Sequence, residues 1–345
     1  AWRNRVETIL WCAPGDQRQM RIFYTGTGGR LARVLLPRLL ANPAVGSIVG
    51  IDLQRAEVEH PKLEQHRRDI RDPGLGTLMR GCDSLIHAGF VVIGAHLGRR
   101  RRQRNWVRDV NVAGSQNVFR QAAENGLTRL VHLSSVAVYS GLPESDHPLS
   151  EHRLLSPLSG FAYAEDKVAV EHWLDGFERD HPQLGLVRLR PHVILGPYAQ
   201  PLLKQLLSQP ICPRTPAGRG RIQCVAEPDV AHAVELAMFG NASGAFNIAA
   251  GPPLSLEQML RSRQIKPIPV PLWAIRLSHR LGWWLTTRAG DPGWTRGLGK
   301  TLTVDCTKAA EQLGWQPEYS VYDCLRMLPS PRRWQTVGTA PTDAD

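Results

Sequence analysis

Thr25-Gly26-Thr27-Gly28-Gly29-Arg30-Leu31-Ala32 connects an apolar segment, residues 21–25, to a helix that we predict over residues 30–40. The apolar segment is typical of a β-strand. Glycine is needed in such a turn because the backbone adopts positive φ and must approach a pyrophosphate closely. The helix behind the turn offers free N–H groups and a positive dipole end to the phosphates. The residues expected to contact a dinucleotide here are Gly26, Gly28, Gly29, Arg30 and Leu31.

Outward from this turn, the chain alternates short β-rich segments with longer helical ones. Strands are predicted at residues 47–51, 84–87, 129–133, 186–190, 221–225 and 245–248, with a further short one ending near Asp69. Helices are predicted at residues 105–124, 161–180 and 229–239. Such alternation gives parallel strands joined by right-handed helical crossovers. We therefore predict an α/β fold, a doubly wound parallel sheet of the Rossmann type with a smaller, mostly helical C-terminal substrate lobe.

Breaks in this pattern predict the domain boundaries. Residues 196–220 are crowded with proline and are expected to form neither regular sheet nor a long helix. Together with residues 251–330 they form the predicted substrate-binding lobe. The other predicted parts are an N-terminal extension (1–19), a dinucleotide-binding domain (20–195, joined by 221–250) and a flexible tail (331–345).

Composition excludes several classes of protein. The chain has 345 residues and a formal net charge of +11 but no recognisable nucleic-acid-binding motif, so no nucleic-acid partner is expected. Its 6 cysteines form no C-x-x-C pair, which argues against a zinc site or a disulfide framework, and no metal is expected. No apolar run approaches the roughly 18 residues that would span a bilayer. The expected compartment is the reducing cytoplasm.

Two further segments allow more than one interpretation. The arginine-rich residues 99–104 border the predicted cleft; a solvated loop is favoured, and a clamp for a substrate diphosphate is the alternative. Residues 271–285 predict an amphipathic, tryptophan-rich helix. For this helix, packing within the small lobe or at a dimer contact is favoured. A peripheral membrane contact, or a pocket for an apolar substrate, stays open.

Asp52 ends the second predicted strand, about twenty residues beyond the turn, where a carboxylate accepts hydrogen bonds from the ribose hydroxyls of NAD. The same carboxylate would repel the additional phosphate of NADP. Arg30 and Arg55 offset its charge in part. The sequence therefore favours NAD as the cofactor and leaves NADP open.

Tyr163 and Lys167 lie four residues apart in the helix predicted over residues 161–180, and therefore on one face of it. Hydride transfer at a carbonyl needs a matched proton donor or acceptor, and a nearby cation brings the tyrosine pKa down from about 10. Ser134 and Ser135 end the preceding strand, where a hydroxyl can hold the reacting oxygen beside the phenol. The predicted catalytic residues are Ser135, Tyr163 and Lys167.

These pieces together resemble an extended short-chain dehydrogenase/reductase of the NAD-dependent epimerase/dehydratase family. The resemblance covers about residues 20–328 and includes matching motifs at residues 82–88, 111–117 and 313–317. It implies that Tyr163 is the general acid/base, that Lys167 lowers its pKa and binds the nicotinamide ribose, and that Ser135 orients the substrate oxygen. It also implies cofactor contacts from Asp69, Ile70, Ala88, Gly89, Asn111, Ser134, Tyr163, Lys167, Pro191, His192 and Val193.

The resemblance further implies an oxidoreductase or epimerase that acts on a secondary alcohol or ketone, with a sugar nucleotide as the first choice of substrate. Val136 and Ala137 follow Ser135 where sugar-nucleotide dehydratases carry an acidic pair, so dehydration is not expected. An apolar, steroid- or lipid-like alcohol is the competing substrate. A dinucleotide-sensing protein without turnover is the alternative outside the enzymes. By analogy with the family, a homodimer through helices 105–124 and 161–180 is expected.

Overall fold

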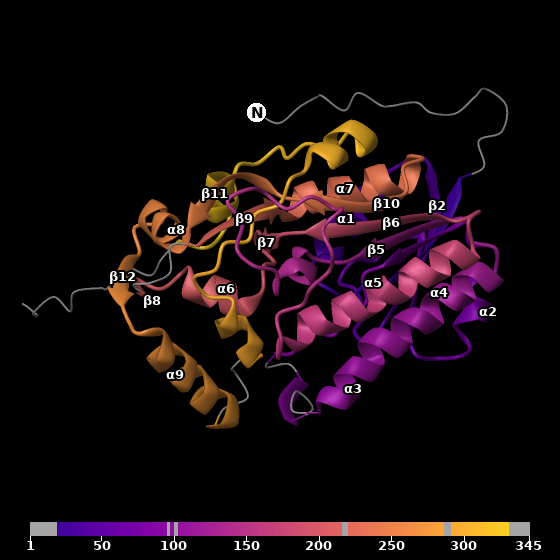
Figure 1. Cartoon of the computed structure of the whole chain (residues 1–345). Coiled ribbons are helices and arrows are strands. Elements are labelled where there is room, and N and C mark those ends of the chain that lie inside the picture. Colours follow the sequence, from indigo (N-terminus) through magenta and orange to yellow (C-terminus); the bar gives the residue numbers. More distant parts are fainter. Residues whose placement is uncertain (1–18, 95–96, 100–102, 216–219, 286–290, 331–345) are drawn as a thin grey trace, which may run out of the picture.

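The computed structural model describes residues 19–330, except 95–96, 100–102, 216–219 and 286–290. Its centre is a seven-stranded parallel sheet in the order β10-β6-β5-β4-β1-β2-β3 (Figure 1). The strands are β1 (Met20–Thr25), β2 (Val45–Asp52), β3 (Leu63–Arg67), β4 (Ser84–His87), β5 (Arg129–Leu133), β6 (Gly185–Pro191) and β10 (Gly244–Ile248). This sheet confirms the predicted doubly wound α/β fold. The predicted tail and nearly all of the predicted N-terminal extension lie outside the described residues.

Helices cover both faces of the sheet, which explains why the central strands are almost continuously apolar. On one face, α1 (Ala32–Ala41) and α7 (Glu227–Phe239) pack into one hydrophobic core. On the other face, α2 (Leu75–Met79), α4 (Gly114–Glu124) and α5 (Ala162–Asp180) form a second core. β1 pairs with β2 on one side and with β4 on the other, so the chain crosses back past β1 between β3 and β4. At such a reversal of strand order, the carboxyl ends of the strands leave a crevice for a ligand.

The helix predicted over residues 105–124 is divided into three parts in the structure. A short helix, α3 (Arg104–Arg108), runs into a π-helical turn, Asp109–Ala113, and then into α4. A π-helical turn carries an additional residue and changes the direction in which its side chains point. Asn111, one of the residues predicted to lie near the cofactor, belongs to this turn.

The remaining described elements build a smaller lobe beside the sheet, and it is less helical than predicted. It contains a three-stranded sheet, β11-β9-β7, and a two-stranded sheet, β12-β8. A short helix and a short strand occupy the proline-rich segment, with Pro201 in the first turn of the helix and Pro213 in the strand. The strands are β7 (Val193–Leu195), β8 (Ile211–Arg214), β9 (Arg221–Ala226), β11 (Ala250–Ser255) and β12 (Lys266–Pro269). The helices are α6 (Pro201–Leu206), α8 (Leu256–Ser262), α9 (Leu272–Leu285) and α10 (Val321–Arg326).

The strand predicted over residues 221–225 is present as β9, but it pairs with β7 and β11 and not with the seven-stranded sheet. It therefore connects the two parts of the fold, because α7 follows it directly and packs on the large sheet. Within the described ranges, each helix is too short or too polar to cross a bilayer.

Candidate active site

A cavity of about 1150 Å³ lies at the carboxyl ends of the strands of the large sheet and reaches into the smaller lobe. Its wall comes from the segments that follow β1, β2, β4, β5 and β6, together with the start of α5. The predicted site residues line this cavity with the exception of Asn111. The fold thus brings together residues that are more than a hundred positions apart in the sequence.

The glycine turn after β1 leaves room for a ligand because it has no side chains. Gly26 has φ +91°, and a Cβ there would lie 2.7 Å from the backbone nitrogen of Gly89 in the turn after β4. A Cβ on Gly28 would overlap the backbone carbonyl of Gln54. The turns after β1, β2 and β4 therefore meet at backbone distance. This arrangement fits the close approach of a pyrophosphate at the N-terminus of α1.

Asp52 lies at the end of β2, next to the glycine turn. Its Oδ2 accepts a hydrogen bond from the backbone N–H of Gly28 (3.1 Å), and its Oδ1 accepts one from Gln54 (2.9 Å). The carboxylate is therefore fixed beside the phosphate-binding turn, where the ribose hydroxyls of a dinucleotide would lie. The next predicted position, Asp69, is held by Arg71 at 2.6 Å, and this hydrogen bond lowers the pKa of the Asp69 carboxyl.

Tyr163 stands in the first turn of α5, among aromatic rings. The ring centroids of Phe90, Phe161 and Trp294 lie 5.6, 5.8 and 6.3 Å from that of Tyr163. The Ser135 hydroxyl hydrogen-bonds the phenol. Its predicted role in orienting a substrate oxygen stays a prediction. Burial nevertheless raises the pKa of Tyr163, and the hydrogen bond from Ser135 offsets only part of this shift.

Lys167 is nearly inaccessible to solvent, and its ammonium group points toward the end of β5. Nζ donates a hydrogen bond to the carbonyl oxygen of Leu133 at 2.5 Å and lies 3.7 Å from the ring centroid of Phe90. Nζ lies 6.0 Å from the ring centroid of Tyr163. Burial lowers the pKa of Lys167 to about 7. Burial thus dominates both side chains, and the pKa of Tyr163 lies above and not below its usual value. The role of Lys167 toward Tyr163 stays a prediction.

Asn111 lies behind the cavity wall, and its side chain holds protein groups in place. Its Oδ1 accepts a hydrogen bond from the backbone N–H of Val91 (2.7 Å), and its Nδ2 donates to the carbonyl oxygen of Val91 (3.1 Å) and to Oδ2 of Asp166 (3.0 Å). Asp166 is fully buried and also binds Arg104. Asn111 therefore orders the segment after β4 and the helix α5, which both contribute to the cavity.

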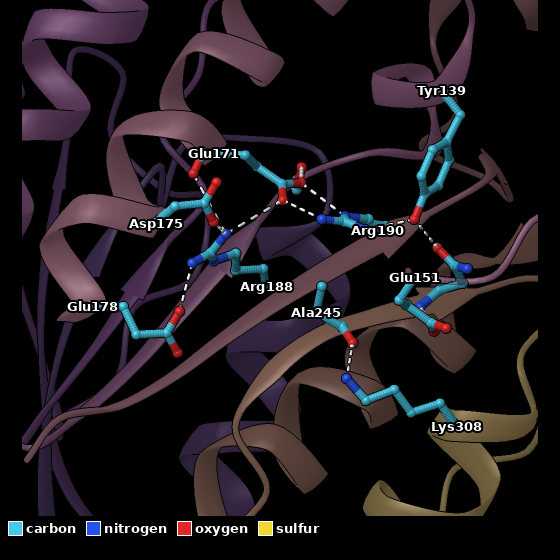
Figure 2. A network of polar contacts seen from close by, with 11 residues as sticks. Tyr139, Glu151, Glu171, Asp175, Glu178, Arg188, Arg190, Ala245 and Lys308 are labelled. Atoms are coloured by element: carbon cyan, nitrogen blue, oxygen red, sulfur yellow. Dashed lines mark hydrogen bonds and ion pairs between the residues drawn. The ribbon is translucent and has the colours of Figure 1, made fainter. Parts of the chain in front are cut away.

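A second buried network lies behind Ser134. Glu171 on α5 accepts hydrogen bonds from Nε and Nη2 of Arg190 (2.9 and 2.5 Å) and from the Ser134 hydroxyl (2.5 Å). Arg190 also donates to the phenol oxygen of Tyr139 at 2.5 Å. Figure 2 shows Glu171 between Arg188 and Arg190, with Tyr139 beyond Arg190. The network ties β5, α5 and β6 together directly behind the catalytic side of the cavity.

His192 and its neighbours link the large sheet to the smaller lobe. The Nε2 of His192 lies 3.0 Å from the carbonyl oxygen of Leu302, and Nδ1 accepts a hydrogen bond from the backbone N–H of Val193 (2.8 Å). Burial lowers the pKa of His192 to about 4, so this imidazole is neutral near pH 7. Pro191, His192 and Val193 line the cavity, and their predicted contact with the cofactor stays a prediction.

Part of the cavity wall is apolar, including the aromatic rings of Phe161 and Trp294 beside Tyr163. These residues could not be identified from the sequence, because no local motif marks them. Trp294, for example, lies in a short 3-10 helix of the smaller lobe that no sequence motif indicates. Two cationic residues, Arg99 and Lys300, also line the cavity. The apolar residues of the wall include Leu142, Pro143, Leu149, Leu158, Phe161, Trp294 and Leu298.

The arginine-rich residues 99–104 had two interpretations, a solvated loop and a clamp for a substrate diphosphate. Neither accounts for both arginines of this segment that the structure describes. Residues 100–102 lie outside the described part of the chain. Arg99 lines the cavity, whereas Arg104 starts α3 and forms an ion pair with Asp166. Arg104 is therefore a structural residue of the site, and a phosphate would have to compete with a buried carboxylate for it.

Comparison with known proteins gives a consistent picture. The model of the family described as "NAD dependent epimerase/dehydratase family" matches residues 22–221. An uncharacterized protein of Mycobacterium tuberculosis is 24% identical over 314 residues, which cover 88% of this chain and 82% of that protein. The 4-hydroxy-2-methyl-3-oxo-4-farnesyl-3,4-dihydroquinoline-1-oxide ketoreductase of Stigmatella aurantiaca is 28% identical over 328 residues, with 86% and 92% covered. The structure of Thermus thermophilus UDP-glucose 4-epimerase with NAD superposes with a TM-score of 0.70 at 20% identity, covering 90% of this chain and 97% of that one.

Proposed function

The chain belongs to the NAD-dependent epimerase/dehydratase family, and on that premise we propose that it interconverts a secondary alcohol and a ketone with Tyr163 as the proton donor or acceptor. It is an enzyme of the short-chain dehydrogenase/reductase type, and the family description confirms NAD as the predicted cofactor. One observation carries the proposal. Tyr163, Ser135 and Lys167 lie in the same cavity as the glycine turn and Asp52.

The residues that would hold NAD are those whose backbone or side chains face the cavity near the carboxyl ends of β1, β2 and β4. Gly26, Gly28 and Gly29 leave space for the pyrophosphate, and Asp52 would accept hydrogen bonds from the ribose. When bound, the nicotinamide ring supplies the acceptor or donor of the hydride. Lys167 is placed to bind the adjoining ribose by exchanging its hydrogen bond to Leu133 for one to a ribose hydroxyl.

The protein's own part in the reaction is to move one proton. In oxidation, the phenolate oxygen of Tyr163 takes the proton of the substrate hydroxyl, and in reduction the phenol returns it to the carbonyl oxygen. The Ser135 hydroxyl, which hydrogen-bonds the Tyr163 phenol, would donate to the same substrate oxygen and keep it beside Tyr163. The aromatic rings of Phe90, Phe161 and Trp294 exclude water from this position.

For the substrate, the geometry favours an alcohol or ketone with an apolar body. The cavity wall includes leucine, proline, phenylalanine and tryptophan side chains, which would bind such a body by burial of apolar surface. The ketoreductase of Stigmatella aurantiaca, whose named substrate carries a farnesyl chain, supports this class. Val136 and Ala137 offer no acid or base beside Ser135, so the proposal does not include elimination of water.

A sugar nucleotide, the first choice from the sequence, is the second candidate. Arg99 and Lys300 line the cavity and could pair with a diphosphate. This candidate is weakened because Arg104, the other arginine that the structure describes within residues 99–104, forms an ion pair with Asp166. The homodimer and the cytoplasmic location expected from the sequence stay predictions.

The experiment combines two measurements. First, the freshly purified protein is denatured and the released nucleotide is quantified. Near-stoichiometric NAD indicates an epimerase that recycles its cofactor, whereas a protein that binds added NAD or NADH reversibly indicates a dehydrogenase or reductase. Second, turnover is measured with rigid apolar ketones and with UDP-sugars. Turnover of UDP-sugars alone would overturn the apolar substrate.

Tyr163→Phe tests the catalytic role. Loss of the phenol oxygen should reduce turnover by at least about 100-fold and leave NAD affinity unchanged. Tyr322→Phe, which alters an exposed tyrosine on α10, is the matched control. If Tyr163→Phe turned over like the wild type, the acid/base role would be wrong.

A further inference from the structure

The helix α9 exposes a stripe of large apolar side chains. The exposed fractions of Trp273, Leu277, Leu281 and Leu285 are 69%, 50%, 51% and 81%. These residues recur at intervals of four and therefore lie along one side of the helix. The other side carries Trp283, which packs against a hydrophobic cluster of the large domain and not within the small lobe as the sequence favoured.

Positive charge surrounds this stripe. Arg276 and Arg280 are exposed on the same helix, next to the apolar side chains in helical projection. From Leu272 to Leu285 the helix has these two arginines and no acidic residue. An apolar stripe flanked by cations is complementary to a lipid surface with anionic headgroups.

The position of α9 connects this surface to the catalytic cavity. Trp283 packs against a cluster that contains Ile93, Val107 and Ala162, the residue next to Tyr163. The helix also contacts the 3-10 helix Pro292–Arg296, which carries Trp294 of the cavity wall. Figure 1 shows α9 on the side of the smaller lobe, away from the seven-stranded sheet.

We propose that α9 binds the surface of membranes that contain anionic lipids, with Trp273, Leu277, Leu281 and Leu285 in the acyl boundary and Arg276 and Arg280 at the headgroups. A helix of 14 residues is too short to cross a bilayer but is long enough to lie in its interface. A second copy of the chain fits this surface less well, because a symmetric pair would bring the arginines of both copies together. The proposal stands without the proposed catalytic function, although this location suits an apolar substrate that is dissolved in the bilayer.

The test is co-sedimentation of the full chain with vesicles. Vesicles of phosphatidylcholine mixed with phosphatidylglycerol should bind the protein, and vesicles of phosphatidylcholine alone should bind it much less. Arg276→Gln/Arg280→Gln should weaken binding to the mixed vesicles by about 30-fold, the effect expected for two cations at an anionic surface. Leu277→Gln/Leu281→Gln should weaken binding to both kinds of vesicle.

Matched controls change equivalent residues elsewhere. Leu154→Gln/Arg80→Gln alters an exposed leucine and an exposed arginine outside α9 and should bind like the wild type. Wild-type binding to mixed vesicles no stronger than to phosphatidylcholine, or full binding by both α9 variants, would overturn the proposal. A third outcome would also overturn it: neither the wild type nor any variant binds vesicles, and an α9 variant changes the oligomeric state in gel filtration. In that case α9 would be a subunit contact.

A second measurement does not depend on the folding of the double variants. Phosphatidylcholine with brominated acyl chains quenches tryptophan fluorescence at the acyl boundary. In mixed vesicles that contain this lipid, the wild type should lose more fluorescence than Trp273→Phe does. Equal quenching of the two proteins would place Trp273 outside the membrane and contradict the proposal.

Discussion

Arg104 and Asp166 form a bidentate ion pair in which Nη1 and Nη2 of the guanidinium lie 2.9 and 2.6 Å from the two carboxylate oxygens. Asp166 precedes Lys167 in the helix that carries Tyr163, and its carboxylate is inaccessible to solvent. Arg104 begins α3. The pair therefore fixes the catalytic helix to the neighbouring one, and it explains why an arginine of a very basic segment turns inward.

We expect Arg104→Met to destabilise the protein by about 3 kcal/mol, because a buried carboxylate would lose its bidentate partner. The free energy of unfolding in urea measures this change. Arg108→Met is the matched control, since Arg108 contacts Asp166 at 3.3 Å with half of its side chain exposed, and should cost less. Equal effects of both variants would mean that the geometry of the pair does not matter.

Ser135→Ala should change the pH dependence of ketone reduction. The reaction needs protonated Tyr163, so its rate falls as the pH rises through the pKa of Tyr163. The Ser135 hydroxyl lowers that pKa, and its removal should move the falling limb to higher pH. Turnover should also drop by roughly 10- to 100-fold with the lost hydrogen bond to the substrate oxygen. A shift of the falling limb of the pH–rate profile to lower pH would contradict the hydrogen bond between Ser135 and Tyr163.

Gly26→Ala should abolish NAD binding, measured by calorimetry. Its φ of +91° disfavours a side chain, and the new Cβ would lie 2.7 Å from the backbone nitrogen of Gly89. Gly126→Ala is the matched control, because its φ is +75° but a Cβ there meets nothing within 4 Å. That variant should lose some stability and bind NAD normally. If both variants bound NAD equally well, the close approach of the two turns would not matter for the cofactor.

Lys167→Met should affect stability in a pH-dependent way. Burial lowers the pKa of Lys167 in the folded protein to about 7, below its usual value of 10.5. The folded state therefore disfavours the charged form, and this penalty is complete below about pH 7 and disappears as the pH rises to about 10.5. The stability of the wild type relative to Lys167→Met should rise across this range. A constant difference in the unfolding free energy would mean that Lys167 keeps its usual pKa.

The strands of the large sheet and the glycine turn could be predicted from the sequence because their signals are local. β4 and β5 were predicted with their observed bounds, since buried parallel strands are short apolar runs. Tyr163 and Lys167 could be placed on one face of a helix from their spacing alone. Asp52 followed from its distance to the turn. In each of these cases, the property depends on residues close together in the chain.

Other features were decided by contacts between distant segments. The small lobe contains two sheets that the sequence did not reveal, because short proline-containing strands lack a periodic pattern. The partner of Arg104, the apolar wall around Trp294 and the place of Asn111 behind the cavity follow from packing across more than fifty residues.

The chain's own sequence thus determined which groups we propose for the chemistry: the glycines, Asp52, Ser135, Tyr163 and Lys167. The tertiary structure decided how these groups are charged and what surrounds them. Burial raises the pKa of Tyr163 and lowers that of Lys167, although the spacing of the two residues alone predicted a lowered tyrosine pKa. The physical reason is that removal from water depends on all neighbours in space, and these come from segments that the local sequence does not specify.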